Sequence, residues 1–363
     1  MTYNKQFSEA LDELYNMMAR RGERHRASAY KKASESLVMY PHEIKTVEQL
    51  KNVPNVGSGI MSKLEELVKT GKIESLEKER NNPINLLTKV YGIGDKNAKD
   101  FISKGITTIE HLKENEHLLT KNMKLGLKYF DDIEKRIPRS EIDLYNIVFN
   151  KLIPSELKYE IVGSYRRGNS TSGDIDIIIT QNDVNNNDDS LFDKYIDILI
   201  SNNIVIEILS RGKKKCLAIA KLGNNPARRV DFLYSPPNEY PFAILYFTGS
   251  KGFNTAQRQR ALEKGFTLNE HGFHYMKNGT KGEKVMHNFL SEKAIFNFLN
   301  MEYKEPHERI DVRSVVLKKN KTQKRKMFLV PTIVTKFREN GISALDNVTE
   351  KDVSELLKKA NIY

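Results

Sequence analysis

Three aspartates, Asp174, Asp176 and Asp231, lie in two short apolar runs of the 363-residue chain. Asp174 and Asp176 are two positions apart in GDIDIIIT, and alternate side chains of a β-strand point to the same face. The run RRVDFLY predicts a neighbouring strand that could add Asp231 to the same cluster. Carboxylates this close repel one another unless a cation lies between them, and hard oxygen ligands suit Mg²⁺. We therefore expect a site for divalent cations here.

The loop GSYRRG before these strands supplies groups that suit phosphate oxygens. Ser164 and the surrounding backbone amides can donate hydrogen bonds, and Arg167 can neutralise a leaving pyrophosphate. Two Mg²⁺ ions held by the carboxylates, or Mn²⁺ in their place, would activate an attacking oxygen and stabilise the leaving one. The chemistry indicated is nucleotidyl transfer, in which a hydroxyl attacks an α-phosphorus. The alternative interpretation of Asp-x-Asp alone, a solvated strand face, leaves the glycine-rich loop and the third aspartate unexplained.

The composition limits the classes of protein to which the chain can belong. Its net charge of +12 and pI of about 9.3 favour a polyanionic partner. Cys216 is the single cysteine, which excludes an intramolecular disulfide and a cysteine-rich zinc site. No apolar run reaches the length of a membrane span, and the N-terminus lacks the apolar core of a signal peptide. We expect an intracellular protein with no membrane partner and no secretion signal.

The chain divides into a helical first part and a strand-rich middle. Residues 7–80 carry apolar residues at helical spacing, and two glycine-punctuated turns, VPNVGSG and VYGIG, each precede a helix. This is the pattern of helix-hairpin-helix turns, whose backbone amides and helix N-termini can meet a DNA phosphate without reading its sequence. The simpler interpretation is a pair of ordinary capping turns. Strand-rich sequence follows to about residue 235, and mixed helical and strand sequence continues to 310.

Eight motifs together resemble the DNA polymerase beta family, also called family X. They read AYKKA, VPNVGSG, VYGIG, GSYRRG, GDIDI, RRVDF, YFTGS and ALEKGFTLNE, and the resemblance runs from about residue 7 to about residue 310. It implies a multidomain α+β fold, in which helical lyase and helix-hairpin-helix domains precede a nucleotidyltransferase-type palm with a mixed β-sheet and a small α+β fingers subdomain. The expected domains are a lyase domain with the first hairpin turn (1–80), a DNA-binding subdomain with the second (81–138), the palm (139–237), a nucleotide-selecting subdomain (238–310) and a basic extension (311–363).

The resemblance assigns roles around the carboxylates. Asp174 and Asp176 resemble ligands of both metal ions, and Asp231 resembles the ligand of the catalytic ion, nearest the primer 3′-hydroxyl. The implied nucleotide contacts are Ser164, Arg167 and Gly173 at the β and γ phosphates, Arg136 as a more distant helper, Tyr246, Phe247 and Gly249 as the sugar-selecting segment, and Asn254 at the incoming base. Leu233 departs from the family, where this position can be an arginine that pairs with the second metal-binding aspartate.

Contacts to DNA are also implied by the resemblance. They are His25, Arg26, Tyr30 and Lys32 around a 5′-phosphate, Gly57, Gly92 and Gly94 in the hairpin turns, Arg229, which couples Asp231 to the closing motion, and Arg258 at the template strand. The two hairpin turns further resemble the family's sites for Na⁺ or K⁺ against a DNA phosphate. The backbone carbonyls implied there belong to Lys51, Val53, Val56, Thr88, Val90 and Ile93. The simpler interpretation is that these segments are only tight turns.

Lys63 resembles the lysine that forms a Schiff base with the sugar aldehyde at an abasic 5′ end. A lysine attacks only in its neutral form, which nearby cations and partial burial favour. We expect such surroundings from His25, Arg26, Tyr30 and Lys32. Gly59 and Ser75 stand where relatives can carry phosphate-binding lysines, and Lys51 and Lys72 are expected to compensate in part.

The resemblance implies a template-directed DNA polymerase that fills short gaps from dNTPs, with 5′-deoxyribose-phosphate lyase activity, in base-excision repair. One alternative is a template-independent terminal nucleotidyltransferase, which usually needs a long loop that blocks the template strand. Another is a non-catalytic scaffold that binds DNA ends, which the three intact aspartates disfavour. The expected partners are gapped or nicked double-stranded DNA, dNTPs and a DNA ligase, with the chain acting as a monomer. The expected location is the nucleus, or a viral replication site or virion for a viral source.

Residues 311–363 lie beyond the part that resembles a polymerase. They include the basic run KKNKTQKRK and end in TEKDVSELLKKANI, which predicts a short amphipathic helix. Our hypothesis is that this extension raises the affinity for gapped DNA.

Overall fold

The computed structural model describes residues 2–80, 82–183, 190–277 and 279–318. The chain separates into two compact units, Met1–Leu299 with Tyr303–Val315 and Asn300–Glu302 with Val316–Tyr363. In the described part of the second unit, Met301 forms an antiparallel bridge with Leu317. The amphipathic helix predicted at the C-terminus lies outside the described residues, as does most of the basic run. Among the described helices, none is both long and apolar enough to cross a membrane.

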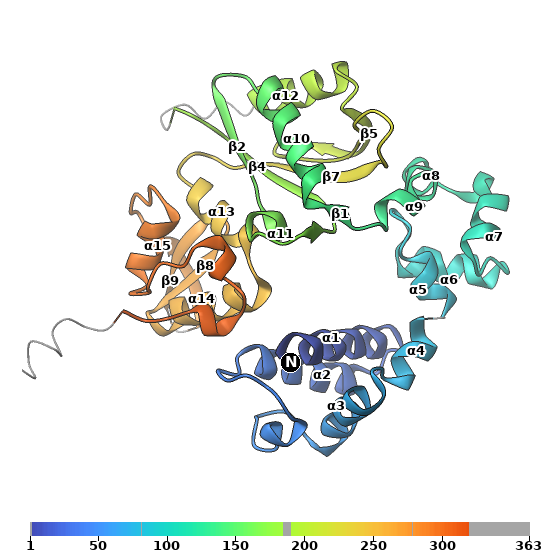
Figure 1. Ribbon diagram of the computed structural model, residues 1–363, viewed down its shortest axis with the longest axis vertical. Helices are drawn as coiled ribbons and strands as arrows, with labels where there is room; N and C mark the ends of the chain where they lie inside the picture. Colours follow the sequence, from blue (N-terminus) through green and yellow to red (C-terminus); the bar gives the residue numbers. More distant parts are fainter. Residues whose placement is uncertain (1, 81, 184–189, 278, 319–363) are drawn as a thin grey trace, which may run out of the picture. The chain divides into compact units, whose positions relative to one another are not determined.

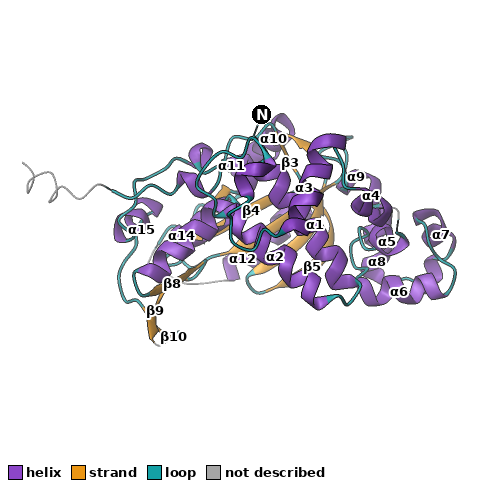
Figure 2. Cartoon of the chain, turned by 90° about the horizontal axis from the view of Figure 1, so that it is seen from below, coloured by secondary structure: helices purple, strands orange, loops and turns teal. Residues whose placement is uncertain are grey.

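The N-terminal part is helical, because its apolar residues recur three and four positions apart (Figures 1 and 2). In the first helix this spacing buries Phe7, Leu11, Leu14 and Met18. The elements are α1 (Asn4–Arg20), α2 (Arg24–Val38), a short 3-10 helix η1 (Val47–Leu50), α3 (Ser58–Thr70) and α4 (Glu74–Arg80). They share one apolar core, to which α2 adds Leu37.

A second helical group follows, with an apolar core of its own that includes Leu87, Phe101 and Leu112. Its elements are α5 (Pro83–Leu87), α6 (Asp95–Ser103), α7 (Ile109–Glu114), η2 (Glu116–Leu118), α8 (Lys121–Lys128) and α9 (Phe130–Ile133). Thr108 and Thr120 begin α7 and α8, each accepting a hydrogen bond from a backbone N–H of the first turn.

The two predicted hairpin turns have matching backbones. In the first, Val56 N donates to Val53 O at 3.2 Å, and in the second Ile93 N donates to Val90 O at 3.0 Å. Each turn also has one left-handed residue at the same place, Asn55 with φ of 65° and Gly92 with φ of 88°. Asparagine and glycine are the residues that adopt this conformation most readily, which explains why the two turns can share a shape without sharing a sequence.

The middle part of the chain forms a five-stranded sheet in the order β2-β4-β7-β6-β5. The strands are β2 (Leu157–Ile161), β4 (Ile175–Gln181), β5 (Val205–Gly212), β6 (Lys215–Ala220) and β7 (Arg228–Tyr234). The β4–β7 pair is parallel and the others are antiparallel, so the sheet is mixed, as expected. A two-stranded ribbon of β1 (Ile137–Pro138) and β3 (Thr171–Ser172) lies at its edge.

The two faces of this sheet have different neighbours (Figure 1). One face, with Ile177 and Phe232, packs against α10 (Arg139–Leu152) and α12 (Ser190–Ser201). Cys216 lies in this core and is fully buried, and burial raises the pKa of its thiol to about 11. The other face, with Ile178, packs against α13 (Tyr240–Thr248). Asp176 and Asp231 alternate with the first set of residues and therefore lie on the second face.

The C-terminal part combines helices with a three-stranded antiparallel sheet in the order β10-β9-β8. Its elements are α14 (Lys251–Glu263), β8 (Phe266–Asn269), β9 (Gly272–Lys277), β10 (Thr280–Lys284), α15 (Glu292–Phe298), η3 (Pro306–Glu308) and η4 (Val312–Ser314). Aromatic rings fill its core, and the centroids of Phe273 and Phe298 are 4.8 Å apart.

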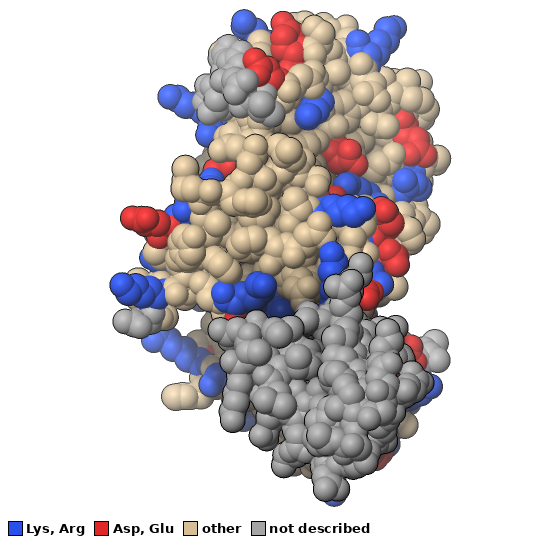
Figure 3. Space-filling model, turned by 90° about the vertical axis from the view of Figure 1, so that its left-hand side faces the viewer, with Lys and Arg blue, Asp and Glu red and all other residues tan. Residues whose placement is uncertain are grey.

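On the face shown in Figure 3, basic and acidic side chains are interspersed, so the positive net charge is not concentrated there.

Candidate functional sites

The β4–β7 register brings two of the three predicted aspartates side by side. Asp176 on β4 and Asp231 on β7 are direct partners across the parallel pair. Asp174 lies just before β4 and is about one third exposed, at 33%, whereas the side chain of Asp231 is 15% exposed. Two of the three predicted carboxylates therefore lie on neighbouring strands, and the third lies one residue before the start of β4.

The carboxylates make this face of the sheet electrostatically unfavourable without a cation. Burial raises the pKa of Asp176 to about 7, and repulsion from Asp174 and Asp231 acts in the same direction. Burial also raises the pKa of Asp231, although Arg229 opposes this effect. A divalent cation would relieve both penalties.

Arg229 supplies the counter-charge in this structure. Its Nη2 pairs with Asp174 Oδ2, and its Nε lies 3.4 Å from Asp231 Oδ1 without forming a hydrogen bond. In the described part of the chain, no three His, Cys, Asp or Glu side chains are gathered as they would be around a metal ion. The donor set nevertheless suits Mg²⁺, since it offers carboxylate oxygens, one of them buried and without a hydrogen-bond partner. A cation held by these carboxylates would have to displace Arg229 from Asp174.

The positive charge near the cluster differs from the expected pattern. Leu233, at the position where the family resemblance allows an arginine, packs in the apolar cluster beneath α13. Lys215, the direct partner of Leu233 on β6, is close enough to lower the pKa values of Asp176 and Asp231 electrostatically. The sequence analysis missed Lys215, because the cross-strand register that brings it here cannot be read locally.

The loop expected at GSYRRG is instead a short helix, α11 (Gly163–Arg166). Gly163 has φ of +64°, and a Cβ there would lie 3.1 Å from Asp176 Oδ2, so the close approach to the carboxylate requires glycine. Ser164 Oγ donates to Ser172 Oγ at 2.8 Å. The predicted phosphate-binding serine therefore lies directly beside the aspartate cluster.

Arg167 joins α11 to the predicted sugar-selecting segment. Its Nη1 donates to Thr248 O at 2.6 Å, and a Cβ at Gly249 would lie 3.3 Å from the same nitrogen. Burial lowers the pKa of Arg167. On the other side of the loop, Arg136 donates to Thr171 O at 2.8 Å, next to Gly173. The four predicted triphosphate contacts thus border one edge of the aspartate site.

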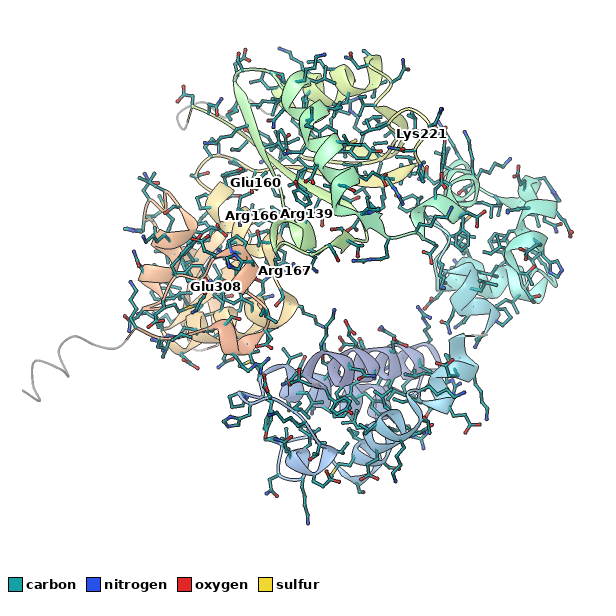
Figure 4. All side chains as sticks on the ribbon, in the orientation of Figure 1. Arg139, Glu160, Arg166, Arg167, Lys221 and Glu308 are labelled. Atoms are coloured by element: carbon teal, nitrogen blue, oxygen red, sulfur yellow. The ribbon has the colours of Figure 1, made fainter. Side chains whose placement is uncertain are left out.

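Arg166, which the sequence analysis did not single out, anchors a buried ionic network (Figure 4). Its Nε donates to Glu160 Oε1 at 3.0 Å, its Nη1 to Thr248 Oγ1 at 2.8 Å, and its Nη2 to Glu292 Oε2 at 2.8 Å. Glu292 also accepts from Arg309 Nη1 at 2.6 Å, and Arg309 is fully buried. Although burial raises the pKa of Glu292, its hydrogen bonds outweigh this and hold the pKa below the ordinary value.

The predicted sugar-selecting and base-contact residues lie at the end of α13 and on α14. Tyr246 and Phe247, on α13, form an edge-to-face pair with ring centroids 5.1 Å apart. Asn254 Nδ2 donates to Tyr246 O at 2.6 Å, and its Oδ1 is buried without a hydrogen-bond partner. Arg258 lines the same small hollow as Tyr246 and Asn254. The side-chain carbonyl of Asn254 is therefore an acceptor that a ligand could satisfy.

Tyr91, in the second hairpin turn, is a further neighbour of the aspartates that the sequence analysis missed. It packs against Leu217 and Ile219, which share the sheet face of the carboxylates. Burial raises the pKa of Tyr91, and the charge of Asp231 adds to this effect. The second hairpin turn thus reaches the edge of the carboxylate site.

The N-terminal helices line a second candidate site, an open cavity of about 920 Å³ around Lys63. Other predicted site residues that line it are Arg26, Tyr30, Val53, Val56 and Gly57, and Gly59 and Ser75, which depart from the family pattern, line it too. His25, Lys32, Lys51 and Lys72, also predicted to act here, do not line it. The cavity gains Arg21, which the sequence analysis missed.

The surroundings of Lys63 differ from the expected cluster of cations. Lys63 Nζ donates to Glu66 Oε2 at 2.8 Å, and the two side chains are 32% and 26% exposed. The hydrogen bond from Lys63 lowers the pKa of Glu66. Because Glu66 occupies Nζ, this pair must open before the amine can attack a sugar.

The backbone carbonyls implied as monovalent-cation ligands stay predictions. Val53 O and Val90 O each accept one N–H within their turn, and a carbonyl oxygen has a second lone pair for a cation. Gly57 and Gly94 are the extended residues that precede α3 and α6.

A mixed sheet that brings carboxylates to one face beside a glycine-initiated helical turn defines a nucleotidyltransferase palm. Four family models match the chain in order. They are a helix-hairpin-helix domain (2–73), the fingers domain of DNA polymerase lambda (85–134), the DNA polymerase beta palm (136–237) and the DNA polymerase beta thumb (243–310). These models give the name fingers to α5–α9 and thumb to the C-terminal part, and we use these names below.

Comparison with known proteins gives the same assignment. DNA polymerase lambda of Arabidopsis thaliana is 33% identical over 330 residues, which cover 84% of this chain and 62% of that protein. DNA polymerase lambda of Rattus norvegicus is 28% identical, covering 85% of the chain and 56% of that protein. DNA nucleotidylexotransferase of Xenopus laevis is 28% identical, covering 84% and 68%. The chain belongs to the DNA polymerase beta family, family X, and spans less than two thirds of the length of both polymerase lambda relatives.

Proposed function

We propose that this protein is a template-directed DNA polymerase that fills short gaps during DNA repair. The observation that carries the proposal is the parallel register of Asp176 and Asp231, with Gly163 in close approach to Asp176 Oδ2. The similarity to two DNA polymerase lambda proteins supports it. The proposed partners are gapped or nicked duplex DNA and dNTPs, with a DNA ligase to seal the product.

The residues around the aspartates have distinct tasks in this reaction. Asp174, Asp176 and Asp231 would hold two divalent cations, which supply activation of the primer 3′-hydroxyl and charge neutralisation at the leaving pyrophosphate. Ser164 and Arg167 bind the triphosphate beside them, and Arg229 releases the carboxylates as the site fills.

Selection of the nucleotide is the task of the segment at the end of α13. Tyr246, Phe247 and the Gly249 turn crowd the sugar, which favours deoxyribose. The unpaired Asn254 Oδ1 accepts a hydrogen bond at the incoming base.

Template-independent addition, the activity named for the Xenopus laevis relative, is the second candidate. The hairpin between β5 and β6 argues against it. Gly212 and Lys215 are paired, so only two residues connect these strands, and no long loop stands there to occupy the path of a template strand. A scaffold without catalysis is disfavoured because all three aspartates are present.

We also propose a 5′-deoxyribose-phosphate lyase activity at the N-terminal cavity. Lys63 Nζ lines the cavity together with Arg26 and Tyr30. The amine would add to the C1′ aldehyde of the abasic sugar with loss of water, forming a Schiff base. Loss of a C2′ proton from the Schiff base then breaks the C3′–O bond, and the downstream strand departs with the electron pair as a 5′-phosphate. Water hydrolyses the remaining Schiff base and restores Lys63, and the filled gap can then be sealed.

One substrate tests both activities, a duplex with a one-nucleotide gap and a 5′-deoxyribose phosphate. Asp231→Ala should abolish Mg²⁺-dependent extension and leave borohydride trapping of the sugar intact. Lys63→Ala should abolish trapping and leave extension intact. If the wild type extends equally well with each single dNTP, irrespective of the template base, terminal transfer takes the place of templated synthesis. If the wild type binds the gapped duplex but does not extend the primer, only the interpretation as a non-catalytic scaffold remains.

A further inference from the structure

Arg21, at the C-terminal end of α1, lines the N-terminal cavity and is held there by a buried carboxylate. Its Nη2 donates to Glu79 Oε2 at 2.5 Å. The side chain of Glu79 is 7% exposed, whereas that of Arg21 is 47% exposed. The guanidinium thus has one end anchored in the protein and the other open to the cavity.

Glu79 is itself fixed on its second oxygen. Asn82 Nδ2 and Asn85 Nδ2 each donate to Glu79 Oε1 at 3.3 Å. The carboxylate therefore cannot turn away from Arg21 without losing these bonds. The remaining N–H groups of Arg21 find no partner among the described residues, so the arginine is oriented before any ligand arrives.

Other donors of the same cavity face the same space. Ser75 Oγ is buried, lines the cavity and has no hydrogen-bond partner among the described residues. Ser58 and Gly59 begin the 13-residue helix α3, and the first N–H groups of a helix lack acceptors within it. A guanidinium fork, a hydroxyl and free amides form a donor set that suits a phosphate monoester.

The other two cations of the cavity are already paired. Lys63 Nζ binds Glu66, and Arg26 Nη1 donates to Glu23 Oε2 at 3.0 Å on the exposed surface. The carboxylates of these two pairs are partly exposed, whereas Glu79, the carboxylate that holds Arg21, is buried. Arg21 is therefore the cation best prepared to bind an anion in this cavity.

We propose that Arg21, oriented by Glu79, binds the terminal phosphate on the 5′ side of a DNA gap, with Ser75 Oγ as a second donor. This places the adjoining sugar at Lys63. The inference rests on the proposed action of the N-terminal cavity on gapped DNA, and it assigns to Arg21 a role that the sequence analysis gave to other cations.

The test compares two one-nucleotide-gapped duplexes that differ only in a 5′-phosphate or a 5′-hydroxyl on the downstream strand. Binding is followed by fluorescence anisotropy at one salt concentration. The wild type should bind the phosphate form about tenfold more tightly, as expected for charge-assisted hydrogen bonds. Arg21→Ala should remove most of this preference, and Arg21→Lys should keep part of it, because a lysine supplies charge without the fork.

Arg24→Ala is the matched control, because Arg24 begins α2 and does not line the cavity. This substitution should weaken binding to both duplexes equally and leave the preference for the 5′-phosphate unchanged. Glu79→Gln retains an acceptor for Arg21 but removes the charge, and it should reduce the preference while the circular dichroism of the helices is unchanged. That variant separates orientation of Arg21 from loss of the fold.

The outcomes separate the inference from the proposed function. If the wild type prefers the 5′-phosphate and Arg21→Ala prefers it equally, the inference is overturned and the Lys63 proposal stands. If Arg21→Ala loses the preference while the wild type traps no sugar with borohydride, the inference stands and the lyase proposal fails. If the wild type has no preference, the assignment of this cavity to the 5′-phosphate is wrong, and the polymerase proposal is unaffected.

Discussion

The palm and the N-terminal cavity hold their charged groups in opposite ways. In the palm and at its contact with the thumb, the side chains of Asp231 and Glu292 are 15% and 9% exposed. Asp231 is positioned by sheet register, and Glu292 pairs with Arg166, which is 126 positions away in the sequence. In the cavity, Lys63 and Arg21 are 32% and 47% exposed, and their partners lie on the same helix or on a nearby one. In the first arrangement the charged groups themselves are largely buried, whereas in the second both cations are partly open to solvent.

This difference predicts where substitutions have large effects. Charges in a low-dielectric interior interact strongly, and removing one partner leaves the other uncompensated. Charges at an open surface are screened by water, so a lost pair costs little. The buried network of Arg166, Glu292 and Arg309 should therefore respond to single changes in stability, whereas the partly exposed pair of Lys63 and Glu66 should respond mainly in rate.

The largest expected effect is that of Glu292→Gln. It leaves the fully buried Arg309 without its carboxylate and also weakens the hold on Arg166, so we expect a loss of about 3–5 kcal/mol in the free energy of unfolding. Urea unfolding followed by circular dichroism measures it. Glu263→Gln is the control, since Glu263 is 51% exposed and its pair with Arg260 lies at the surface. An equal loss in both variants would show that burial of the network is unimportant.

Next in size is Gly163→Ala, which acts on geometry. The new Cβ would lie 3.1 Å from Asp176 Oδ2 and would force that carboxylate to shift. The backbone of Gly163 is also in the left-handed conformation, which strains an alanine. We expect primer extension to fall about 100-fold, because misplacement of a catalytic group by a fraction of an ångström is costly. Gly168→Ala is the matched control, with φ of +83° but no atom closer than 3.8 Å. It should share the backbone strain and keep most of the activity.

Asp176→Asn should change stability with a defined dependence on pH in metal-free buffer. Because burial raises the pKa of Asp176 to about 7, the ionised carboxylate destabilises the folded chain, and this penalty grows as pH rises from about 4 to about 7. The variant should therefore gain about 1–3 kcal/mol relative to wild type at pH 8 and nothing below pH about 4. Thermal unfolding with a chelator present measures it.

Asp311→Asn provides a control of opposite sign for that experiment. Although burial raises the pKa of Asp311, hydrogen bonds to Arg313 hold it below the ordinary value, so its ionised form stabilises the fold. This stability is present above the unfolded pKa and is lost as pH falls through the folded pKa. The variant should be less stable than wild type at neutral pH. The same sign in both variants would contradict the assignment of burial as the cause at Asp176.

The smallest expected effect on stability is that of Glu66→Gln in the cavity. The pair with Lys63 is partly exposed, and glutamine Oε1 can still accept the N–H of Glu74 that now reaches Glu66 at 2.6 Å. We expect a change of less than about 1 kcal/mol in the free energy of unfolding. Borohydride trapping should become several-fold faster, because Lys63 Nζ is no longer held by the ion pair with Glu66. Slower trapping would mean that Glu66 assists the reaction.

Much of the palm could be predicted from the sequence because its signals are local. Apolar runs with Asp at alternate positions predict strands with carboxylates on one face, and β4 and β7 have this arrangement. The glycine at the start of α11 likewise lies in a motif of adjacent residues. Such features depend only on the period of the strand and on the conformation of one residue.

The partners of Arg166 could not be predicted in this way. Arg166 and Glu292 are 126 positions apart, and nothing near Glu292 distinguishes it from a surface glutamate. Arg21 and Glu79 are 58 positions apart and meet only through helix packing. The pair of Lys63 and Glu66 is different, because a spacing of three on one helix was visible in the sequence and predicts an ion pair.

The buried position of Cys216 has a practical consequence for measuring these effects. It is the chain's single thiol, and its raised pKa and burial in the palm core make it unreactive towards maleimides and mild oxidants. A cysteine introduced at the exposed Ser103, at the end of α6, would then be the only site to accept a fluorescent label. Movements of the fingers on DNA could be followed in a chain that keeps every one of its native active-site groups.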